Sequence, residues 1–306
     1  MPLAVRFEEY GDIDVLEVVD VTAPDPGPGQ VLVKVVAAGI NPGEASIRKG
    51  LLHAMWPATF PSGEGSDLAG VVAGLGAGVR DLALGDEVLG FVDTRSSHAE
   101  FVVAEATNLV PRPADVPWEV AGSLFVAGTT AYAAVRAVGV AAGDTVVVSG
   151  AAGGVGSLAV QLAVQAGATV IGLASEDHHP WLVSHGVVPV VYGEGTVERI
   201  RSASGGHVDA LVDTFGGGYV EMAISLGVAP ARIDTIIDRA AAAEYGAKTE
   251  GSAAAATADV LAELARLVGA GRLEVPIAGS YPLREVRAAY RQLEQRHALG
   301  KIVLKP

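Results

Sequence analysis

Residues 145–174 constrain the fold more than any other part of the chain. Thr145–Ser149 (TVVVS) is a short apolar, β-branched run, and the glycine-rich stretch Gly150–Gly156 follows it directly. Ser157–Ala166 has helical spacing, and Thr169–Ala174 (TVIGLA) is a second apolar run. Such runs are typical of parallel strands that are buried on both faces, and parallel strands need a helical crossover between them. The order strand, turn, helix, strand therefore predicts an α/β unit.

The alternation of strands and helices continues towards the C-terminus. Further strands are predicted at Val187–Tyr192, Ala210–Asp213, Arg232–Ile237 and Lys301–Lys305, and amphipathic helices at Val260–Val268 and Arg284–His297. The Ala-rich stretch 240–258 has two interpretations, a loop followed by a helix or a weak edge strand near Glu244–Lys248. This pattern predicts a doubly wound parallel sheet with helices on both faces.

The first 117 residues have a different character. Short β-type runs lie between Gly- and Pro-rich turns, and no helix of three turns is predicted. The runs are Val15–Asp20, Val31–Ala37, Gly70–Leu75, Glu87–Phe91 and Ala99–Val103. We therefore expect a folded β unit that is separate from the parallel sheet.

Composition excludes several classes of function. Half of the residues are hydrophobic, so a sizeable core is expected, and the net charge of −14 disfavours nucleic acid and anionic membranes as partners. No apolar run is long enough to span a bilayer, and no signal peptide is visible. Cysteine is absent, which removes disulfides, thiolate zinc sites and cysteine nucleophiles. A cytoplasmic location is the expectation.

The glycine-rich turn has the spacing of a dinucleotide-binding turn, with anchors at Ala151, Gly153 and Gly156. The first anchor makes the tight turn, Gly153 lets backbone N–H groups approach a diphosphate, and Gly156 allows the helix to pack closely on the strand. Gly154 and Val155 lie between these anchors and belong to the same predicted cradle. An ordinary structural turn is the alternative, and the position between a strand and a helix favours dinucleotide binding.

The residue that ends the second strand bears on the choice of cofactor. An acidic residue there would bind the ribose hydroxyls of NAD, but this strand ends in Ser175, which tolerates a 2′-phosphate and favours NADP. Glu176 and Asp177 follow immediately and keep NAD open. His178 and Tyr192 are the candidate phosphate partners, and a solvated helix start is the alternative role for His178.

Several segments, in order along almost the whole chain, resemble the zinc-independent quinone oxidoreductase branch of the medium-chain dehydrogenase/reductase superfamily. The matching segments are Ala38–Pro42 with Ile47–Gly50, Gly65–Val72, Gly85–Val88, Ala127–Tyr132, Gly150–Gly156 with Gln161, Val212–Gly217 and Gly300–Leu304.

The resemblance implies a fold and an activity. The implied fold is a chaperonin-10-like (GroES-like) β-barrel domain over residues 1–117, a Rossmann domain over 118–268, and a segment over 269–306 that returns to complete the first domain. The implied activity is hydride transfer from NADPH, favoured over NADH, to a quinone or an α,β-unsaturated carbonyl compound, by a homodimer. An enoyl-type reductase acting on a biosynthetic intermediate and a non-catalytic NADP(H)-binding redox sensor are the alternatives.

The resemblance also implies roles for individual residues. Asn41 lines the substrate side, Thr130 contacts the nicotinamide, and Ser46 stands where relatives often carry an aromatic residue, which makes it a candidate weak proton donor. The residues expected to border the cofactor are Phe215, Gly216, Ile236 and Lys301. Zinc-dependent relatives carry Cys near position 41 and His near position 66, where this chain has Asn41 and Ser66, so no zinc site is expected.

Overall fold

The computed structural model describes all 306 residues, which divide into two compact units. The first unit comprises Met1–Val126, Thr257–Arg272 and Ile277–Pro306, and the second comprises Ala127–Ala256 and Leu273–Pro276. The predicted boundaries after residues 117 and 268 differ from these bounds. The unit boundary follows Val126, and the helix α9 (Ala258–Gly269) belongs to the first unit.

The second unit is built on five parallel strands in the order β11-β10-β9-β12-β13. Their bounds are Thr145–Ser149 (β9), Thr169–Leu173 (β10), Val188–Val190 (β11), Ala210–Asp213 (β12) and Ile233–Thr235 (β13). The central strands β9, β10 and β12 are apolar along most of their length because both faces of the sheet are covered. This is the doubly wound parallel sheet that the sequence predicts.

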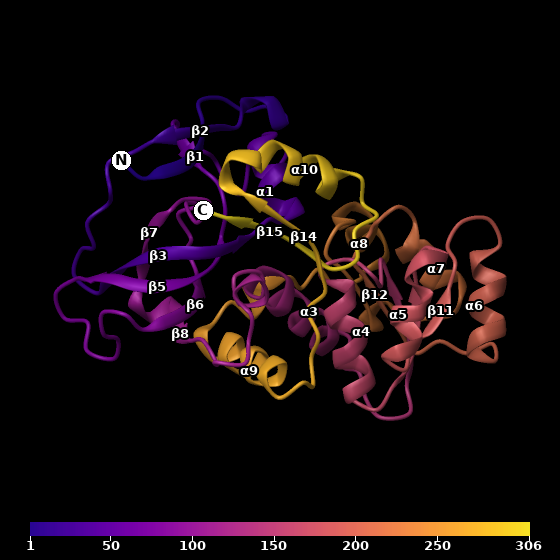
Figure 1. The fold of residues 1–306 in the computed structure, drawn as a ribbon. Helices are drawn as coiled ribbons and strands as arrows, with labels where there is room; N and C mark the ends of the chain where they lie inside the picture. Colours follow the sequence, from indigo (N-terminus) through magenta and orange to yellow (C-terminus); the bar gives the residue numbers. More distant parts are fainter. The chain divides into compact units, whose positions relative to one another are not determined.

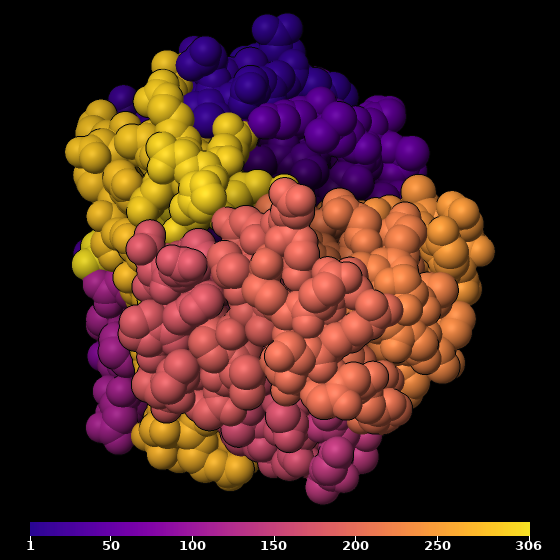
Figure 2. Space-filling view, turned by 90° about the vertical axis from the view of Figure 1, so that its right-hand side faces the viewer, coloured from indigo at the N-terminus to yellow at the C-terminus, as the bar shows by residue number.

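Helices connect these strands (Figure 1), and Figure 2 shows one face of the unit in space-filling form. Their bounds are Phe125–Ala137 (α3), Gly156–Gln165 (α4), His179–Ser184 (α5), Thr196–Ser204 (α6), Tyr219–Ser225 (α7) and Arg239–Tyr245 (α8), with 3-10 turns at Glu176–His178, Pro230–Arg232 and Ser252–Ala254. The stretch 240–258 begins within α8, which ends at Tyr245, so the helix precedes the loop rather than following it. The alternative, an edge strand near Glu244–Lys248, corresponds only to an isolated parallel bridge between Lys248 and Asp234.

Gln161 on α4 holds the short returning segment Leu273–Pro276 against the second unit. Its Nε2 donates to the Glu274 carbonyl at 2.8 Å, and its Oε1 accepts from the Glu274 N–H at 2.8 Å. The indole Nε1 of Trp181 donates to the Glu274 carboxylate at 3.1 Å. These bonds satisfy the backbone of a segment that belongs to no strand.

The first unit contains two sheets. One has the order β2-β1-β4, and the other has the order β14-β15-β3-β5-β6-β8, with β7 paired to β3. The strands are Leu3–Phe7 (β1), Glu17–Asp20 (β2), Gln30–Gly39 (β3), Ser62–Gly63 (β4), Asp67–Leu75 (β5), Glu87–Phe91 (β6), Phe101–Glu105 (β7), Leu109–Pro111 (β8), Ile277–Pro282 (β14) and Lys301–Lys305 (β15). The helices are Pro42–Arg48 (α1), Trp118–Ala121 (α2), Ala258–Gly269 (α9) and Val286–Glu294 (α10), with 3-10 turns at Ile13–Val15, Ala106–Asn108 and Leu283–Glu285.

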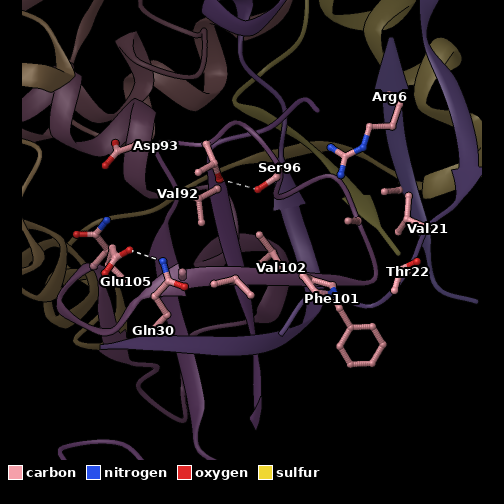
Figure 3. A pocket seen from close by; sticks show the side chains of 17 residues that line it. Arg6, Val21, Thr22, Gln30, Val92, Asp93, Ser96, Phe101, Val102 and Glu105 are labelled. Carbon is pink, nitrogen blue, oxygen red and sulfur yellow. Dashed lines mark hydrogen bonds between the residues drawn. The ribbon is translucent and has the colours of Figure 1, made fainter. Parts of the chain in front are cut away.

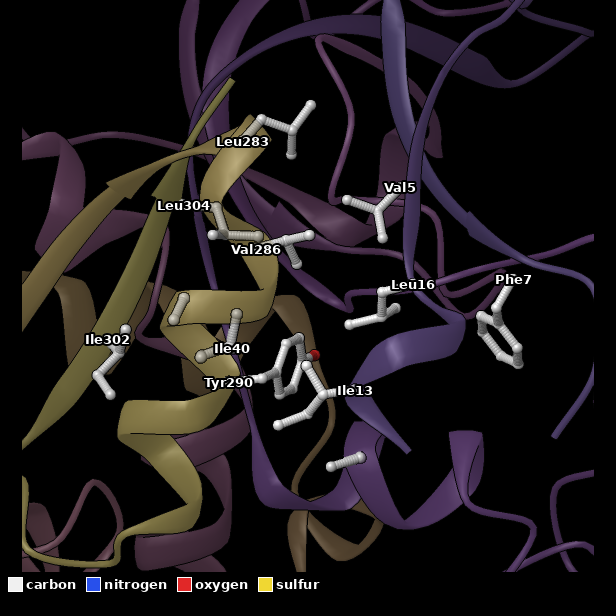
Figure 4. Close-up of a cluster of buried hydrophobic side chains, with 12 residues drawn as sticks. Val5, Phe7, Ile13, Leu16, Ile40, Leu283, Val286, Tyr290, Ile302 and Leu304 are labelled. Carbon is white, nitrogen blue, oxygen red and sulfur yellow. The ribbon is translucent and has the colours of Figure 1, made fainter. Parts of the chain in front are cut away.

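The C-terminal segment completes the first unit. Strand β15 pairs antiparallel with β3, where Val303 lies opposite Gly39, and parallel with β14. Side chains of α10 and β15, among them Tyr290 and Ile302, pack with Val5 and Leu16 from the start of the chain in one hydrophobic cluster (Figure 4). Residues from both ends of the chain therefore share one core.

Helix α9 shows why the predicted boundary at residue 268 differs from the observed one. Its amphipathic pattern predicts the helix correctly, and Leu261, Leu264 and Ala265 are buried. Gly269 lies against Pro113 and Val116, so the helix end packs on the first unit. Periodicity shows which face of a helix is buried, but it does not show which unit covers that face. None of the helices is long and apolar enough to cross a membrane.

Candidate functional site

The glycine turn lies where the strand order of the second unit reverses. Strands β10 and β11 continue the sheet on one side of β9, and β12 and β13 continue it on the other. In open parallel sheets, ligands bind in the crevice at the carboxyl ends of the strands beside such a reversal. Gly150 leaves β9 with a φ of +57°, and a Cβ on Gly156 would lie 2.1 Å from the Gly150 carbonyl oxygen. Only glycine fits at position 156 without moving the turn.

The turn presents some of its residues and buries others. Gly153, Gly154 and Val155 are half-buried, and the helix α4 begins at Gly156. Ala151 is fully buried, and its N–H donates to the Leu173 carbonyl at 3.0 Å. We therefore assign Ala151 to the support of the turn, whereas the stretch 153–155 forms the accessible cradle. A glycine cradle at a helix N-terminus fits an anionic diphosphate.

Asp213 at the end of β12 organises the neighbouring turn, and the sequence analysis did not include it among the site residues. Its Oδ1 accepts from the Gly216 N–H at 2.9 Å and from the Ser149 hydroxyl at 2.5 Å. Its Oδ2 accepts from the Thr235 hydroxyl at 2.7 Å. The carboxylate is fully buried and joins the ends of β9, β12 and β13. A buried acidic residue at a strand end, three positions before the glycine run 216–218, is a signal that could have found it.

Other predicted cofactor residues lie along the same edge of the sheet. Ser175 precedes the 3-10 turn after β10, and Ile236 follows β13 and donates its N–H to the Asp213 carbonyl at 3.1 Å. The rings of Tyr192 and Phe215 stand 6.5 Å apart at an angle of 24°, and they are 40% and 37% exposed. Exposed aromatic rings at this edge fit the flat surfaces of a base or a nicotinamide.

Thr130 and His178 are two further predicted residues of the second unit. Thr130 lies in α3 and is buried. His178 closes the 3-10 turn after β10 and precedes α5, so the helix-start alternative describes its place in the chain. Tyr192, Ser175 and the glycine cradle are brought together by the parallel strand order.

Asn41 sits in a buried polar network of the first unit. Its Nδ2 donates to the carboxylates of Glu44 and Asp67, at 3.1 Å each, and its Oδ1 accepts from the Lys301 ammonium at 2.5 Å. Both amide protons therefore have acceptors already. Asn41 is expected to line the substrate side, and in this arrangement neither amide proton is free to donate to a ligand. Asn41 also starts α1 through a capping box with Glu44.

Lys301 is buried, and its partners all belong to the first unit. Its ammonium donates to the Ile40 carbonyl at 3.1 Å and lies 3.6 Å from the Asp67 carboxylate, and the side chain is 4% exposed. Burial raises the pKa of Asp67, and the Lys301 ammonium opposes that rise. Two of its protons serve Ile40 and Asn41, and its charge lies beside Asp67, so Lys301 supports this buried network.

Ser46 does not point to a proton-donor role. Its hydroxyl donates to the Pro42 carbonyl one turn earlier in α1, at 3.1 Å. Serine commonly satisfies itself in this way within a helix, which leaves the hydroxyl without a proton directed at a ligand. The seven-residue helix α1 explains the difference, because it was not predicted from the sequence.

A second buried pair, Arg48 and Glu64, lies beside the network. The guanidinium of Arg48 contacts the Glu64 carboxylate and stacks 4.5 Å from the centre of the Tyr290 ring, and both charged side chains are almost fully buried. Burial raises the pKa of Glu64 to about 7, although the Arg48 charge opposes the rise. The Tyr290 hydroxyl donates to the Glu44 carboxylate at 3.2 Å. These residues pack beside the network around Asn41.

The raised pKa of Glu64 makes stability depend on pH. Between the ordinary glutamate pKa of 4.5 and about 7, the folded chain keeps a proton that the unfolded chain releases, so this group stabilises the fold at low pH and loses that contribution as pH rises. We expect the free energy of unfolding to fall by about 2 kcal/mol between pH 5 and pH 7.5 from this group. Glu64→Gln, which mimics the protonated acid, should remove that fall. Urea unfolding of both proteins across this pH range measures the difference, and parallel profiles would contradict the assignment.

A cavity of about 310 Å³ in the first unit is a separate feature. Arg6, Gln30, Ser96 and Phe101 are among the residues that line it, and Figure 3 shows them around the opening. None of the predicted site residues lines this cavity. The side chains form no group of three or more His, Asp or Glu residues placed to hold a metal ion.

The two-unit fold and the glycine cradle define a class, the dinucleotide-dependent oxidoreductases with a separate β unit. Comparison with known families agrees. A model described as "Alcohol dehydrogenase GroES-like domain" matches residues 27–140, and one described as "Zinc-binding dehydrogenase" matches residues 185–304. The chain belongs to the zinc-independent quinone oxidoreductase branch of the medium-chain dehydrogenase/reductase superfamily. The predicted fold class, a GroES-like domain with a Rossmann-type sheet, is confirmed.

Individual relatives are similar over nearly the whole chain. An NADPH-dependent alkenal/one oxidoreductase of Arabidopsis thaliana is 29% identical over 320 residues, which covers 98% of this chain and 78% of the relative. The quinone oxidoreductase structure from Coxiella burnetii is 31% identical, with a TM-score of 0.88, and the match covers 100% of this chain and 99% of that one. A mycobacterial protein solved in complex with NADPH is 28% identical, with a TM-score of 0.88, and the match covers 100% of both chains.

Proposed function

We propose that this oxidoreductase transfers hydride from NADPH to a quinone or an α,β-unsaturated carbonyl compound without the help of a metal ion. The observation that carries the proposal is the cradle 153–156 at the strand reversal, held next to the turn 215–216 by the buried Asp213. The printed names of the relatives support the substrate class, and the NADPH-bound relative supports the cofactor.

The residues of the second unit would bind and orient the cofactor. The cradle 153–156 would hold the diphosphate through backbone N–H groups and the start of α4. Tyr192 and Phe215 offer ring faces at the sheet edge, and Asp213 fixes the backbone that carries Phe215. Thr130 would bind the nicotinamide carboxamide, as the resemblance implies. The work of this unit is orientation, since a well-positioned donor accounts for much of the rate of hydride transfer.

The chemistry requires no protein nucleophile. When bound, the reduced nicotinamide would supply a hydride, with its electron pair, to an electron-poor carbon or oxygen of the acceptor, and solvent would supply the proton that completes the reduction. In the first unit, the side chain of Asn41 is fixed by Glu44, Asp67 and Lys301, and the resemblance implies that Asn41 lines the substrate side. Because its amide protons are already bound, Asn41 shapes the acceptor side by its position and not by donating to the acceptor oxygen.

A steady-state assay tests this function. NADPH and NADH oxidation is followed at 340 nm with a panel of quinones and enones, with and without a metal chelator. We expect turnover with NADPH that the chelator leaves unchanged. Oxidation that the chelator abolishes would contradict the metal-independent proposal. Cofactor binding without oxidation across the panel would favour the non-catalytic redox sensor, and turnover only with an enoyl thioester would favour the enoyl-type reductase.

Assembly is a further part of the proposal. The resemblance implies a homodimer, and we propose that state for this chain as well. Light scattering coupled to gel filtration measures it directly, because a dimer has twice the 31.0 kDa mass of the chain. A single species at the mass of one chain would contradict it.

A further inference from the structure

We propose that Arg199 is the cation that recognises the 2′-phosphate of NADPH in this chain, from helix α6 rather than from the turn after β10. The inference rests on the proposed function and adds the residue that would set cofactor preference. A phosphate monoester is held best by charge-assisted hydrogen bonds, and a guanidinium provides them with fixed geometry.

The turn after β10 does not provide a permanent cation. Ser175 is followed by Glu176 and Asp177, both exposed acidic residues, which would repel a phosphate. Across residues 169–206 the only Lys or Arg residues are Arg199 and Arg201. A permanent positive charge from this part of the second unit therefore has to come from α6.

The strand register brings the start of α6 to the same edge. Strands β10 and β11 are parallel neighbours with Leu173 opposite Val190, and the Ala174 N–H donates to the Val190 carbonyl at 3.1 Å. Ser175 and the residues after Val190 thus leave the sheet side by side. Arg199 reaches this point, because its Nε donates to the Val191 carbonyl at 3.0 Å.

Arg199 is held in place, and part of its guanidinium is unused. Its Nη2 donates to the Thr196 hydroxyl at 3.2 Å, while Nη1 has no acceptor within the protein. Nη1 lies beside Gly195, where a Cβ would approach it to 3.2 Å. Because position 195 has no side chain, Nη1 stays uncovered. Two hydrogen bonds fix the group before any ligand arrives, which lowers the entropic cost of binding.

The alternative is that the carboxylate of Glu176 or Asp177 accepts hydrogen bonds from the ribose hydroxyls of NADH. A cation at the 2′-phosphate predicts that 2′,5′-ADP binds more tightly than 5′-AMP, and an acidic residue at the ribose predicts the reverse. Both nucleotides lack a nicotinamide, so binding can be measured without any turnover. Arg201 is a matched control: it lies two residues later in α6, is exposed, and projects from a different face of the helix.

The experiment compares the intact protein with Arg199→Gln, Arg199→Lys and Arg201→Gln. Calorimetry measures the affinities for 2′,5′-ADP and 5′-AMP, and fluorescence titration measures those for NADPH and NADH. We expect Arg199→Gln to weaken NADPH and 2′,5′-ADP at least about tenfold, with NADH and 5′-AMP changed less than about twofold. Arg199→Lys should recover part of the loss, and Arg201→Gln should resemble the parent protein.

Several outcomes would overturn the inference, and they are distinguishable from failure of the proposed function. If the parent binds NADPH but Arg199→Gln binds it equally well, another group holds the phosphate and the function stands. If the parent prefers NADH and 5′-AMP, the acidic residues after Ser175 bind the ribose. If the parent binds neither dinucleotide, the proposed function itself fails.

Discussion

Gly153→Asp is expected to weaken NADPH binding at least about 100-fold while the fold survives. The backbone φ of Gly153 is not in the left-handed region, and a Cβ there would meet only the Gly150 carbonyl oxygen, at 3.2 Å. The chain therefore tolerates a side chain with a small adjustment. A carboxylate at this point would face the bound diphosphate, and repulsion between like charges would oppose binding by roughly 3 kcal/mol, which corresponds to that factor.

Fluorescence titration with NADPH measures the affinity, and circular dichroism measures the midpoint of thermal unfolding. Gly153→Ala is the matched control, because it adds the Cβ without the charge and should keep the affinity within about tenfold of the parent. Full NADPH affinity in Gly153→Asp would show that the diphosphate does not lie at this turn. That result would remove the main support for the proposed function.

Lys301→Met is expected to destabilise the protein by about 3–5 kcal/mol. The substitution leaves the Asp67 carboxylate buried without its cationic partner, and the loss of one member of a buried ion pair usually costs this much. Because burial raises the pKa of Asp67, the deficit should shrink as pH is lowered and the carboxyl group takes up a proton.

Urea unfolding of three variants separates the pair from its surroundings. Asp67→Asn combined with Lys301→Met should recover most of the loss, because no uncompensated charge remains. Lys305→Met is the control on the same strand: that lysine is half-exposed and pairs with Glu119, so its loss should cost less than about 1 kcal/mol. Equal effects of Lys301→Met and Lys305→Met would contradict the assignment of Lys301 to the buried network.

Part of the candidate site could be predicted from the sequence, and part of it could not. The glycine turn could be predicted because its anchors lie within a few residues of one another, and the steric demands of that short stretch depend on glycine itself. The role of Asp213 could not be predicted, because its partners Ser149 and Thr235 lie on other strands, far away in the sequence. The hydrogen-bond partners of Ser46, Asn41 and Lys301 are seen only in the structure, because a one-dimensional pattern does not show contacts between distant residues.

The sequence by itself determined the parallel sheet, the turn after β9 and the family, because local periodicity and glycine spacing are short-range properties. The tertiary structure alone decided that Lys301 meets Asn41 across 260 positions of the chain, that α9 belongs to the first unit, and that Arg199 reaches the end of β11. These contacts depend on how distant segments pack, and packing assigns a partner to a polar group only when the whole chain is folded.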